Sequence, residues 1–251
     1  MDSTSAIGKV ALITGTSRRI GRATALRLAD CGADLVIHAK AARDEVEAVA
    51  QEVRARGRRA LVCMADVTDE ASVAGMMQAI RDTYGRLDVL VNNASVRRHA
   101  PFLEMTLAEW REIISVILDG AFLCSRAALP LMIAGGGGAI VNIGGVTAHV
   151  GASERAHVST AKAGLIGLTK ALAVEFAASN VRVNCVVPGK IGGQRSATSG
   201  RGLVTGEGNE PLLGRMGDVD EVAALIAAMC LPMSSYMTGQ TIHVNGGMYL
   251  P

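Results

Sequence analysis

The sequence predicts an α/β fold in which a doubly wound parallel sheet of about seven strands lies between two helical layers, three layers in all. Three observations favour this fold class. Short runs rich in β-branched residues alternate with longer amphipathic patterns along the whole chain. Several short runs are almost wholly apolar, as strands buried on both faces of a sheet are. A glycine-containing turn joins the first such run to the first helical pattern, as in Rossmann-type domains.

Length and composition are those of one large globular domain. The chain has 251 residues, of which 49% are apolar and 19% are charged, so it can bury a large core. Three Phe, three Tyr and one Trp are all its aromatic residues, which predicts an aliphatic core. No shift of composition marks a second domain, so we expect residues 1–251 to form a single domain.

Seven runs are expected to form the strands. In chain order they are Val10–Thr14, Asp34–Ala39, Ala60–Met64, Asp88–Asn92, Ala139–Ile143, Val181–Val187 and Thr241–Val244. The segments between them repeat apolar residues at helical spacing, and two of these helices are expected to be long, over Leu107–Met132 and Ser153–Ser179. Residues 194–214 are polar and Gly-rich without periodicity, and a connection of that length is usually a lid or a substrate loop.

Several classes of protein are disfavoured. A formal charge of +2, with no Lys/Arg run longer than two, predicts no nucleic-acid partner. The N-terminus resembles no signal peptide, and no uninterrupted apolar stretch approaches the ~20 residues of a membrane span. The cysteines are widely spaced, which predicts reduced thiols in a cytoplasmic protein and neither a disulfide framework nor a metal site; they are Cys31, Cys63, Cys124, Cys185 and Cys230.

The turn after the first strand indicates a phosphate-binding loop. It spans Thr14 to Gly21 and leads directly into a helix. Gly15 allows a tight turn, and Gly21 allows the helix to approach the strand or a phosphate closely. The helix N-terminus then offers free N–H groups and a positive dipole end to a pyrophosphate. A single loop of this kind is also found in ordinary strand–helix turns, so the interpretation depends on the rest of the chain.

Further motifs make the chain resemble the short-chain dehydrogenase/reductase family over nearly its whole length. The loop is similar to TGxxxGxG, except that Arg19 replaces the middle glycine, as in pteridine reductases. Asp66-Val67 resembles the adenine-binding pair, Asn92–Ser95 the NNAG element, and Pro188-Gly189 the PG turn. The resemblance implies a dinucleotide cofactor held by Gly15, Ser17, Arg18, Arg19, Ile20, Gly21, Lys40, Asp66, Val67, Asn93, Ala94, Lys162, Pro188, Gly189 and Ile191.

Charge near the second strand predicts NADP(H) as the cofactor. NAD enzymes place an acid at the end of this strand to accept the ribose hydroxyls. Here the position is Ala39, followed by Lys40, with Arg18 in the glycine loop opposite. Two cations without a carboxylate favour a 2′-phosphate. The alternative is that Lys40 and Arg43 are only solvated surface charges.

The catalytic residues that the resemblance implies are mostly replaced. In this family a Tyr donates a proton to the carbonyl oxygen, a Lys four residues later lowers the pKa of that Tyr and holds the ribose, a Ser orients the substrate and an Asn anchors a water chain. Lys162 is present, but the Tyr position is Val158, the Ser position Gly145 and the Asn position Ile117. The usual reductase mechanism therefore cannot operate unchanged.

Three sources could supply the missing proton. His157 adjoins the lost Tyr and titrates near neutrality, although on a helix it would point about 100° away from Val158. Lys162 could instead position a water molecule. A substrate such as an iminium ion would need no donor. Thr147 and His149 border the expected substrate cleft and are weaker candidates.

Two functional hypotheses remain, with a third less favoured. The first is an NADP(H)-dependent oxidoreductase, most similar in pattern to 3-oxoacyl-carrier-protein reductases, acting on a small carbonyl, hydroxyl or imine substrate. Arg97 and Arg98 follow Asn93 and could clamp an anionic substrate. The second is a silent NADP(H)-binding pseudoenzyme or regulatory subunit. A non-redox lyase or dehalogenase is less favoured because such relatives keep the Ser and Tyr and lose the cofactor loop.

The residues of the nicotinamide half favour the enzyme. Lys162, Asn93 and Pro188-Gly189 would serve little purpose in a protein that binds only adenosine, whereas Gly193 stands where the family has a carboxamide-binding Thr. Members of the family commonly assemble into tetramers through the two long helices and the last strand, so the resemblance implies a homotetramer.

Overall fold

The computed structural model describes residues 3–192 and 210–251. Within these residues, the first half of the chain alternates strands and helices: β1 (Val10–Ile13), α1 (Arg19–Asp30), β2 (Asp34–Ala39), α2 (Arg43–Ala55), β3 (Ala60–Met64), α3 (Glu70–Tyr84) and β4 (Val89–Asn92). A long helical segment follows: α4 (Leu107–Ile114), the π-helix η1 (Ser115–Asp119) and α5 (Gly120–Ala134). The remainder comprises β5 (Gly138–Ile143), α6 (Thr147–Val150), α7 (Ala156–Phe176), η2 (Ala177–Ser179), β6 (Val181–Pro188), α8 (Val219–Cys230), η4 (Pro232–Ser234) and β7 (Thr241–Val244).

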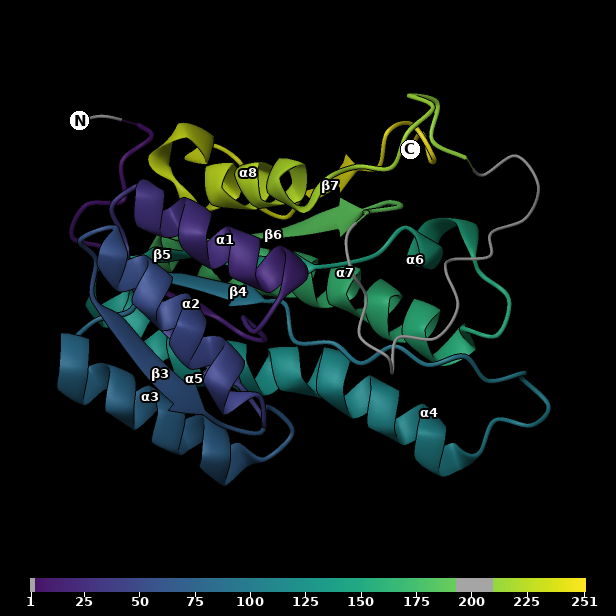
Figure 1. The fold of residues 1–251 in the computed structure, drawn as a ribbon, viewed down its shortest axis with the longest axis horizontal. Helices are drawn as coiled ribbons and strands as arrows, with labels where there is room; N and C mark the ends of the chain where they lie inside the picture. Colours follow the sequence, from purple (N-terminus) through teal and green to yellow (C-terminus); the bar gives the residue numbers. More distant parts are fainter. Residues whose placement is uncertain (1–2, 193–209) are drawn as a thin grey trace.

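The described strands form one parallel sheet in the order β3-β2-β1-β4-β5-β6-β7 (Figure 1). The chain winds outward from β1 in one direction and from β4 in the other. Parallel strands need helical crossovers, so helices cover both faces. The carboxyl ends of β1 and β4 therefore diverge into loops on opposite faces, and this switch point is where such sheets bind ligands. The predicted fold class is confirmed.

Two aliphatic clusters hold the helices to the two faces. One packs α1, α2 and α8 against the sheet through residues such as Leu28, Val46 and Ile226. The other packs α3, α5 and α7 on the opposite face, for example through Ile80, Met132 and Phe176. Leu12 and Leu90 contribute from the strands and are fully buried. All five cysteines are free thiols.

Helix ends agree with local chemistry. Thr106 and Glu109 form a capping box at the start of α4, and Asp218 and Glu221 form another at α8. Helix α3 ends at Gly85, whose φ of 68° suits glycine. The long helix expected over Leu107–Met132 is present but is interrupted by a π-helical turn, which the periodicity did not predict.

The segment Leu107–Ala134 is long and apolar enough, by length and composition alone, to cross a membrane. Half of its most apolar window is buried inside the protein, as in a core helix. The predicted substrate loop, 194–214, lies mostly outside the described residues, as does Gly193. Of the loop's last residues, Leu213 donates its backbone N–H to the carbonyl of Gly246 at 3.1 Å.

Candidate active site

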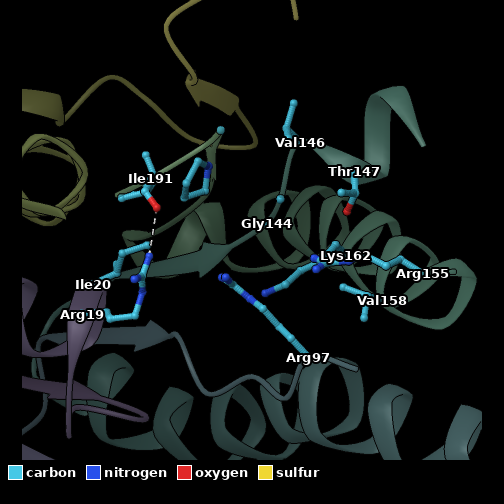
Figure 2. A pocket seen from close by; sticks show the side chains of 13 residues that line it. Arg19, Ile20, Arg97, Gly144, Val146, Thr147, Arg155, Val158, Lys162 and Ile191 are labelled. Atoms are coloured by element: carbon cyan, nitrogen blue, oxygen red, sulfur yellow. Dashed lines mark hydrogen bonds between the residues drawn. The ribbon is translucent and has the colours of Figure 1, made fainter. Parts of the chain in front are cut away.

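A cavity lies at the carboxyl ends of the central strands (Figure 2). Its lining comes from the start of α1, the loop after β4, the segment after β5, the first half of α7 and the loop after β6. Among the described residues that line it, four are cationic and none is a carboxylate; the lining comprises Arg19, Ile20, Arg97, Gly144, Gly145, Val146, Thr147, Arg155, Val158, Lys162, Pro188, Gly189 and Ile191. The cavity is therefore suited to a ligand that carries negative charge.

The glycine turn brings the backbone of β1 and α1 very close together. Gly15 has a φ of 71°. A Cβ on Gly21 would lie 2.1 Å from the Gly15 carbonyl oxygen, so no larger residue fits there without a backbone shift. Arg19 also adopts a left-handed φ, of 50°, which explains why glycine suits this position in the resembled motif. Its guanidinium donates to the carbonyl oxygen of Ile191 at 3.1 Å, across the cavity mouth (Figure 2).

Two side chains brace this turn from neighbouring strands. The Asn93 amide donates to the carbonyls of Thr14 and Gly15 at 2.9 and 2.8 Å. The N–H groups of Asn93 and Ala94 both donate to the hydroxyl of Thr14. Asn93 and Ala94 thus act on the turn's shape, and they are not among the residues that line the cavity.

His38 is a second brace, and sequence reasoning missed it. Its Nδ1 accepts the Gly15 N–H at 3.1 Å, so in the neutral ring the proton lies on Nε2, 3.0 Å from the carbonyl oxygen of Ala65. Burial lowers the pKa of His38, which favours this neutral form. A histidine inside an apolar strand gave no signal of this role, because the contact depends on how β2 lies beside β1.

The start of α1 fits the pyrophosphate of a dinucleotide. The N-cap residue, Arg18, makes no side-chain capping bond, and the first turn contains no acidic residue. The positive dipole end of the helix therefore favours an anion at this position. Ser17 is half-buried in the turn and Ile20 is buried beside the cavity. A Cβ on Gly189 would lie 2.7 Å from Cα of Asn245, which explains the glycine of the Pro188-Gly189 turn on the other side.

At the expected adenosine end, both predicted phosphate ligands contact carboxylates. Lys40 Nζ lies 2.6 Å from Asp66 Oδ2, and Arg18 Nε lies 3.0 Å from Glu45 Oε2. The assumption that these cations have no carboxylate beside them was wrong. Asp66 follows the neighbouring strand β3, and α2 folds Glu45 back toward the glycine turn, so neither contact could be inferred from sequence distance.

Asp66, expected as the first residue of the adenine pair, is bonded to groups on both sides of it. The Lys40 ammonium, and then the N–H and hydroxyl of Thr68, hold the pKa of its carboxyl at about 2. Val67 is buried, and a Cβ at Gly120, the first residue of α5, would lie 2.8 Å from its Cγ2, so a larger residue there would require a shift. Ala39, at the acid position of NAD enzymes, is buried and carries no carboxylate.

Lys162 is a buried titratable group that lines the cavity. It is 4% exposed, and its Nζ donates to the Ile143 carbonyl oxygen at 2.5 Å. Burial, aided by the nearby positive charge of Arg97, lowers the pKa of Lys162 to about 7. A lysine with this pKa exchanges a proton readily near neutrality.

The three positions assigned to the lost catalytic groups lie around Lys162. Val158 and Gly145 line the same cavity. Ile117 is buried in one apolar cluster with Val158 and lies in the π-helix η1. A Cβ on Gly145 would lie 3.6 Å from Lys162 Cγ, an ordinary contact, so space does not exclude a serine there. Val158, Gly145 and Ile117 therefore surround or adjoin the cavity without a hydroxyl or amide side chain at the positions that the resemblance assigns to catalytic groups.

His157, the other predicted catalytic residue, does not line the cavity. Its side chain is fully buried, and the charged groups near it include Glu109 on α4. Burial lowers the pKa of His157, which disfavours the protonated form near pH 7. Of the weaker candidates, Thr147 lines the cavity, whereas His149 packs against His243 and Tyr249.

The side chains of the predicted arginine pair, Arg97 and Arg98, lie in different surroundings. Arg97 lines the cavity and its side chain extends toward Lys162 (Figure 2). Arg98 points instead to α4, where it forms an ion pair with Glu112 at 2.8 Å. A different arginine, Arg155, lines the cavity from the N-cap of α7; it lies three residues before Val158, and no sequence motif indicated it.

The fold and this site together define a dinucleotide-binding α/β protein, and comparisons with known proteins identify the family. A family model described as "Enoyl-(Acyl carrier protein) reductase" matches residues 15–249. The 3-oxoacyl-[acyl-carrier-protein] reductase FabG of Staphylococcus aureus is 38% identical over 242 residues, which are 96% of this chain and 98% of that protein.

Solved structures agree. A short-chain type dehydrogenase/reductase from Mycobacterium marinum has a TM-score of 0.89 and 34% identity, covering 100% of this chain and 98% of the other. A gluconate 5-dehydrogenase from Burkholderia cenocepacia, solved with NADP and tartrate, has a TM-score of 0.88 and 29% identity, covering 98% and 97%. The chain belongs to the short-chain dehydrogenase/reductase family of oxidoreductases.

Proposed function

We propose that the protein is an NADP(H)-dependent oxidoreductase that acts on a small anionic carbonyl, hydroxyl or imine substrate and takes its proton from a group other than tyrosine. The observation that carries this proposal is that several residues expected in the nicotinamide half of the site meet at one cavity. Lys162, Pro188 and Ile191 line one cavity beside the glycine turn. The bound cofactor would supply or accept a hydride there.

The choice of NADP(H) rests on the second strand and the groups that follow it. Ala39 offers no carboxylate to the ribose hydroxyls. The Arg18–Glu45 and Lys40–Asp66 ion pairs are solvent-exposed, with side-chain exposures of 50%/45% and 70%/27%. Exposed pairs of this kind contribute only about 0–1 kcal/mol, so a 2′-phosphate can displace the carboxylates at little cost.

Calorimetric titration with NADPH and NADH tests this choice. Lys40→Ala should weaken NADPH binding about tenfold or more and leave NADH binding within twofold, since only the phosphate uses the ammonium. Glu45→Gln should tighten NADPH binding, because it removes the acid that competes for Arg18. Arg43→Ala, which removes an exposed cation at the start of α2, serves as the matched control. Equal losses for both dinucleotides in Lys40→Ala would contradict the phosphate assignment.

Lys162 is the best-placed proton source for this reaction. It is buried within the cavity, and its pKa of about 7 provides a mixture of ammonium and amine near neutrality. Its ammonium can give a proton to the substrate oxygen directly or through a water molecule. Arg97 supports the anionic substrate because its side chain extends into the same cavity (Figure 2).

A silent cofactor-binding protein is the alternative, favoured by Val158, Gly145 and Ile117. A screen of carbonyl and cyclic imine substrates against the wild type and the double variant Val158→Tyr/Gly145→Ser separates the two. An active wild type supports the enzyme. The protein is a silent subunit if three results hold together: NADPH binds, the wild type is inactive on every compound, and the double variant is active. The scaffold can then still support hydride transfer.

Assembly and location belong to the same proposal. Exposed apolar side chains on the long helices, among them Leu107, Phe122 and Val174, support a homotetramer built through these helices. The free cysteines support a cytoplasmic location.

A further inference from the structure

The surroundings of Lys162 favour a neutral amine. Lys162 is 4% exposed, and of the lysines that the structure describes it alone lines the cavity. None of the described lining residues is a carboxylate, so no anion in that lining offsets the charge of an ammonium. With a pKa of about 7, about half of Lys162 is amine at pH 7, against roughly 0.04% of a lysine with the ordinary pKa of about 10.4.

Charged and titratable groups face Lys162 from several elements. The positive charge of Arg97, in the loop after β4, adds to the effect of burial, whereas the Cys185 thiol on β6 acts in the opposite sense. Arg155 lines the cavity while its Nη2 lies 2.5 Å from His99 Nε2. The remaining charged side chain of the described lining is Arg19. The balance of these groups is positive, which opposes a further positive charge on Lys162.

The hydrogen bond of Lys162 leaves its nitrogen able to react. A carbonyl oxygen only accepts hydrogen bonds, so Ile143 holds an N–H of the lysine and does not engage the lone pair of the amine. Figure 2 shows the side chain reaching from α7 into the space between the lining residues. A lysine that is desolvated, or that lies next to another cation, is activated in this way as a nucleophile toward carbonyl carbon.

The replaced positions beside Lys162 suit such a nucleophile. Val158 lies four residues earlier on α7, on the same helix face, and its side chain offers no hydrogen bond. A Cβ on Gly145 would lie 3.6 Å from Lys162 Cγ and 3.9 Å from Thr147 Oγ1. The glycine therefore leaves room beside the lysine stem, and a hydroxyl borders the same space. Lys162 has an apolar wall on one side and space for a small molecule on the other.

We propose that Lys162 is a nucleophile that forms a covalent imine with a small aldehyde or ketone, an activity beyond the proposed function because it needs no dinucleotide. The amine nitrogen bonds to the carbonyl carbon while the second C=O electron pair moves to oxygen. A proton then passes from nitrogen to oxygen, which gives a carbinolamine. The nitrogen lone pair expels this oxygen, which takes a proton from the solvent and leaves as water. The product is a protonated imine.

Reductive trapping without dinucleotide tests the inference. Pyruvate is a suitable probe, because it is a small ketone whose carboxylate matches the cationic lining. Sodium cyanoborohydride reduces its imine to a carboxyethyl group that stays on nitrogen, and peptide mass spectrometry locates the group. At pH 7.5 we expect at least about tenfold more label on Lys162 than on Lys170, which is exposed on the same helix.

A matched pair of variants tests the role of the neutral amine. Val158→Glu places a carboxylate four residues before Lys162, where it can pair with the ammonium and keep the nitrogen protonated. It should lower the label on Lys162 about tenfold or more. Val158→Gln, of the same size without the charge, should keep most of the label. Far-UV circular dichroism checks that both variants fold.

The pH dependence in the wild type gives a readout that needs no variant. Nα-acetyllysine added to the same mixture serves as a standard with the ordinary pKa. The ratio of label on Lys162 to label on this standard should rise about fourfold from pH 7.5 to pH 5.5, because a lysine with a pKa of about 7 loses less of its amine over that range.

Four outcomes would each overturn the inference. They are no label on Lys162 in the wild type, equal label on Lys162 and Lys170, equal label on Lys162 in folded Val158→Glu and Val158→Gln, and a ratio to the standard that does not change with pH. Failure of the proposed function is seen separately, as absence of NADPH binding in the wild type.

Discussion

At the scale of single residues, burial decides the chemistry of Lys162. Water no longer solvates its ammonium, and Arg97 adds repulsion, so the pKa falls to about 7 from an ordinary value near 10.4. A folded-state pKa below the unfolded one means that folding releases a proton between these two values. The cost of burying the charge is therefore complete below about pH 7 and disappears as the pH rises toward 10.4.

Replacement of this lysine by an apolar residue of similar shape should stabilise the protein. Lys162→Met is expected to raise the free energy of unfolding by about 1–4 kcal/mol at pH 6, with the gain declining steadily above pH 7. Urea unfolding of both proteins from pH 6 to pH 10 measures this difference. Lys170→Met, on the exposed side of the same helix, is the control. A gain independent of pH would show that packing, and not charge, is responsible.

Reduction should follow the same titration. If the Lys162 ammonium provides the proton, the rate of carbonyl reduction falls as the pH rises through about 7, because the amine form has no proton to give. The rate under saturating NADPH and substrate from pH 5.5 to pH 9 checks this. His157→Gln should keep the same profile, since His157 lies outside the cavity lining. Loss of activity in folded His157→Gln would restore His157 as the donor.

At the scale of elements, the turn between β1 and α1 combines a short glycine path with braces from β2 and β4. Gly15 bends the chain, Gly21 leaves room for the Gly15 carbonyl, and His38 and Asn93 hold Gly15 through hydrogen bonds to its N–H and carbonyl oxygen. The π-helix η1 is a contrasting case, in which an irregular backbone is present without the side chain expected on it. It keeps its irregular turn at Ile117 although the side chain that the resemblance assigns there is gone.

Two helical glycines allow a matched test of the turn. Gly21→Ala places a methyl group 2.1 Å from a carbonyl oxygen, so we expect a loss of about 1–3 kcal/mol in stability and at least tenfold weaker NADPH binding. Gly75→Ala, in α3 with nothing within 4 Å of its Cβ, should instead stabilise by about 0.5–1 kcal/mol with binding unchanged. Thermal melting and dinucleotide titration of both variants measure these effects. Normal binding in Gly21→Ala would mean that the turn does not shape the cofactor site.

At the scale of the whole molecule, the long helices carry large apolar side chains that are exposed in the single chain. Val174 is 83% exposed on α7, and Phe122 is 45% exposed on α5. In a symmetric assembly a substitution on a two-fold interface meets its own copy, which doubles its effect.

A charged substitution should therefore dissociate the proposed homotetramer. The wild type is expected to elute as a tetramer, and Val174→Glu as a smaller species, because like charges are forced together at the interface. Light scattering coupled to size exclusion measures the mass, with far-UV circular dichroism as the check of folding. Met233→Glu, also exposed but on η4, should leave the mass unchanged. A monomeric wild type would disprove the tetramer.

The sequence by itself determined the elements and the family. The expected strands match those of the structure at both ends for β2, β3 and β7 and within one residue elsewhere. The spacing of apolar residues and the positions of the turn glycines are local properties of the chain. The glycine turn, Lys162 and Pro188-Gly189 also lie within motifs of fixed spacing. The presence of the cofactor half could therefore be predicted before any contact was known.

Only the tertiary structure decided which side chains meet. It brought Glu45 to Arg18 and Asp66 to Lys40, directed Arg98 away from the cavity and Arg155 into it, and removed His157 from the lining. Residues such as His99 and Arg155 lie 56 positions apart in the chain, so no periodicity links them. The physical reason is that charge pairing and burial act through space: they depend on which strands and loops become neighbours, a property of the folded sheet and not of any short stretch of sequence.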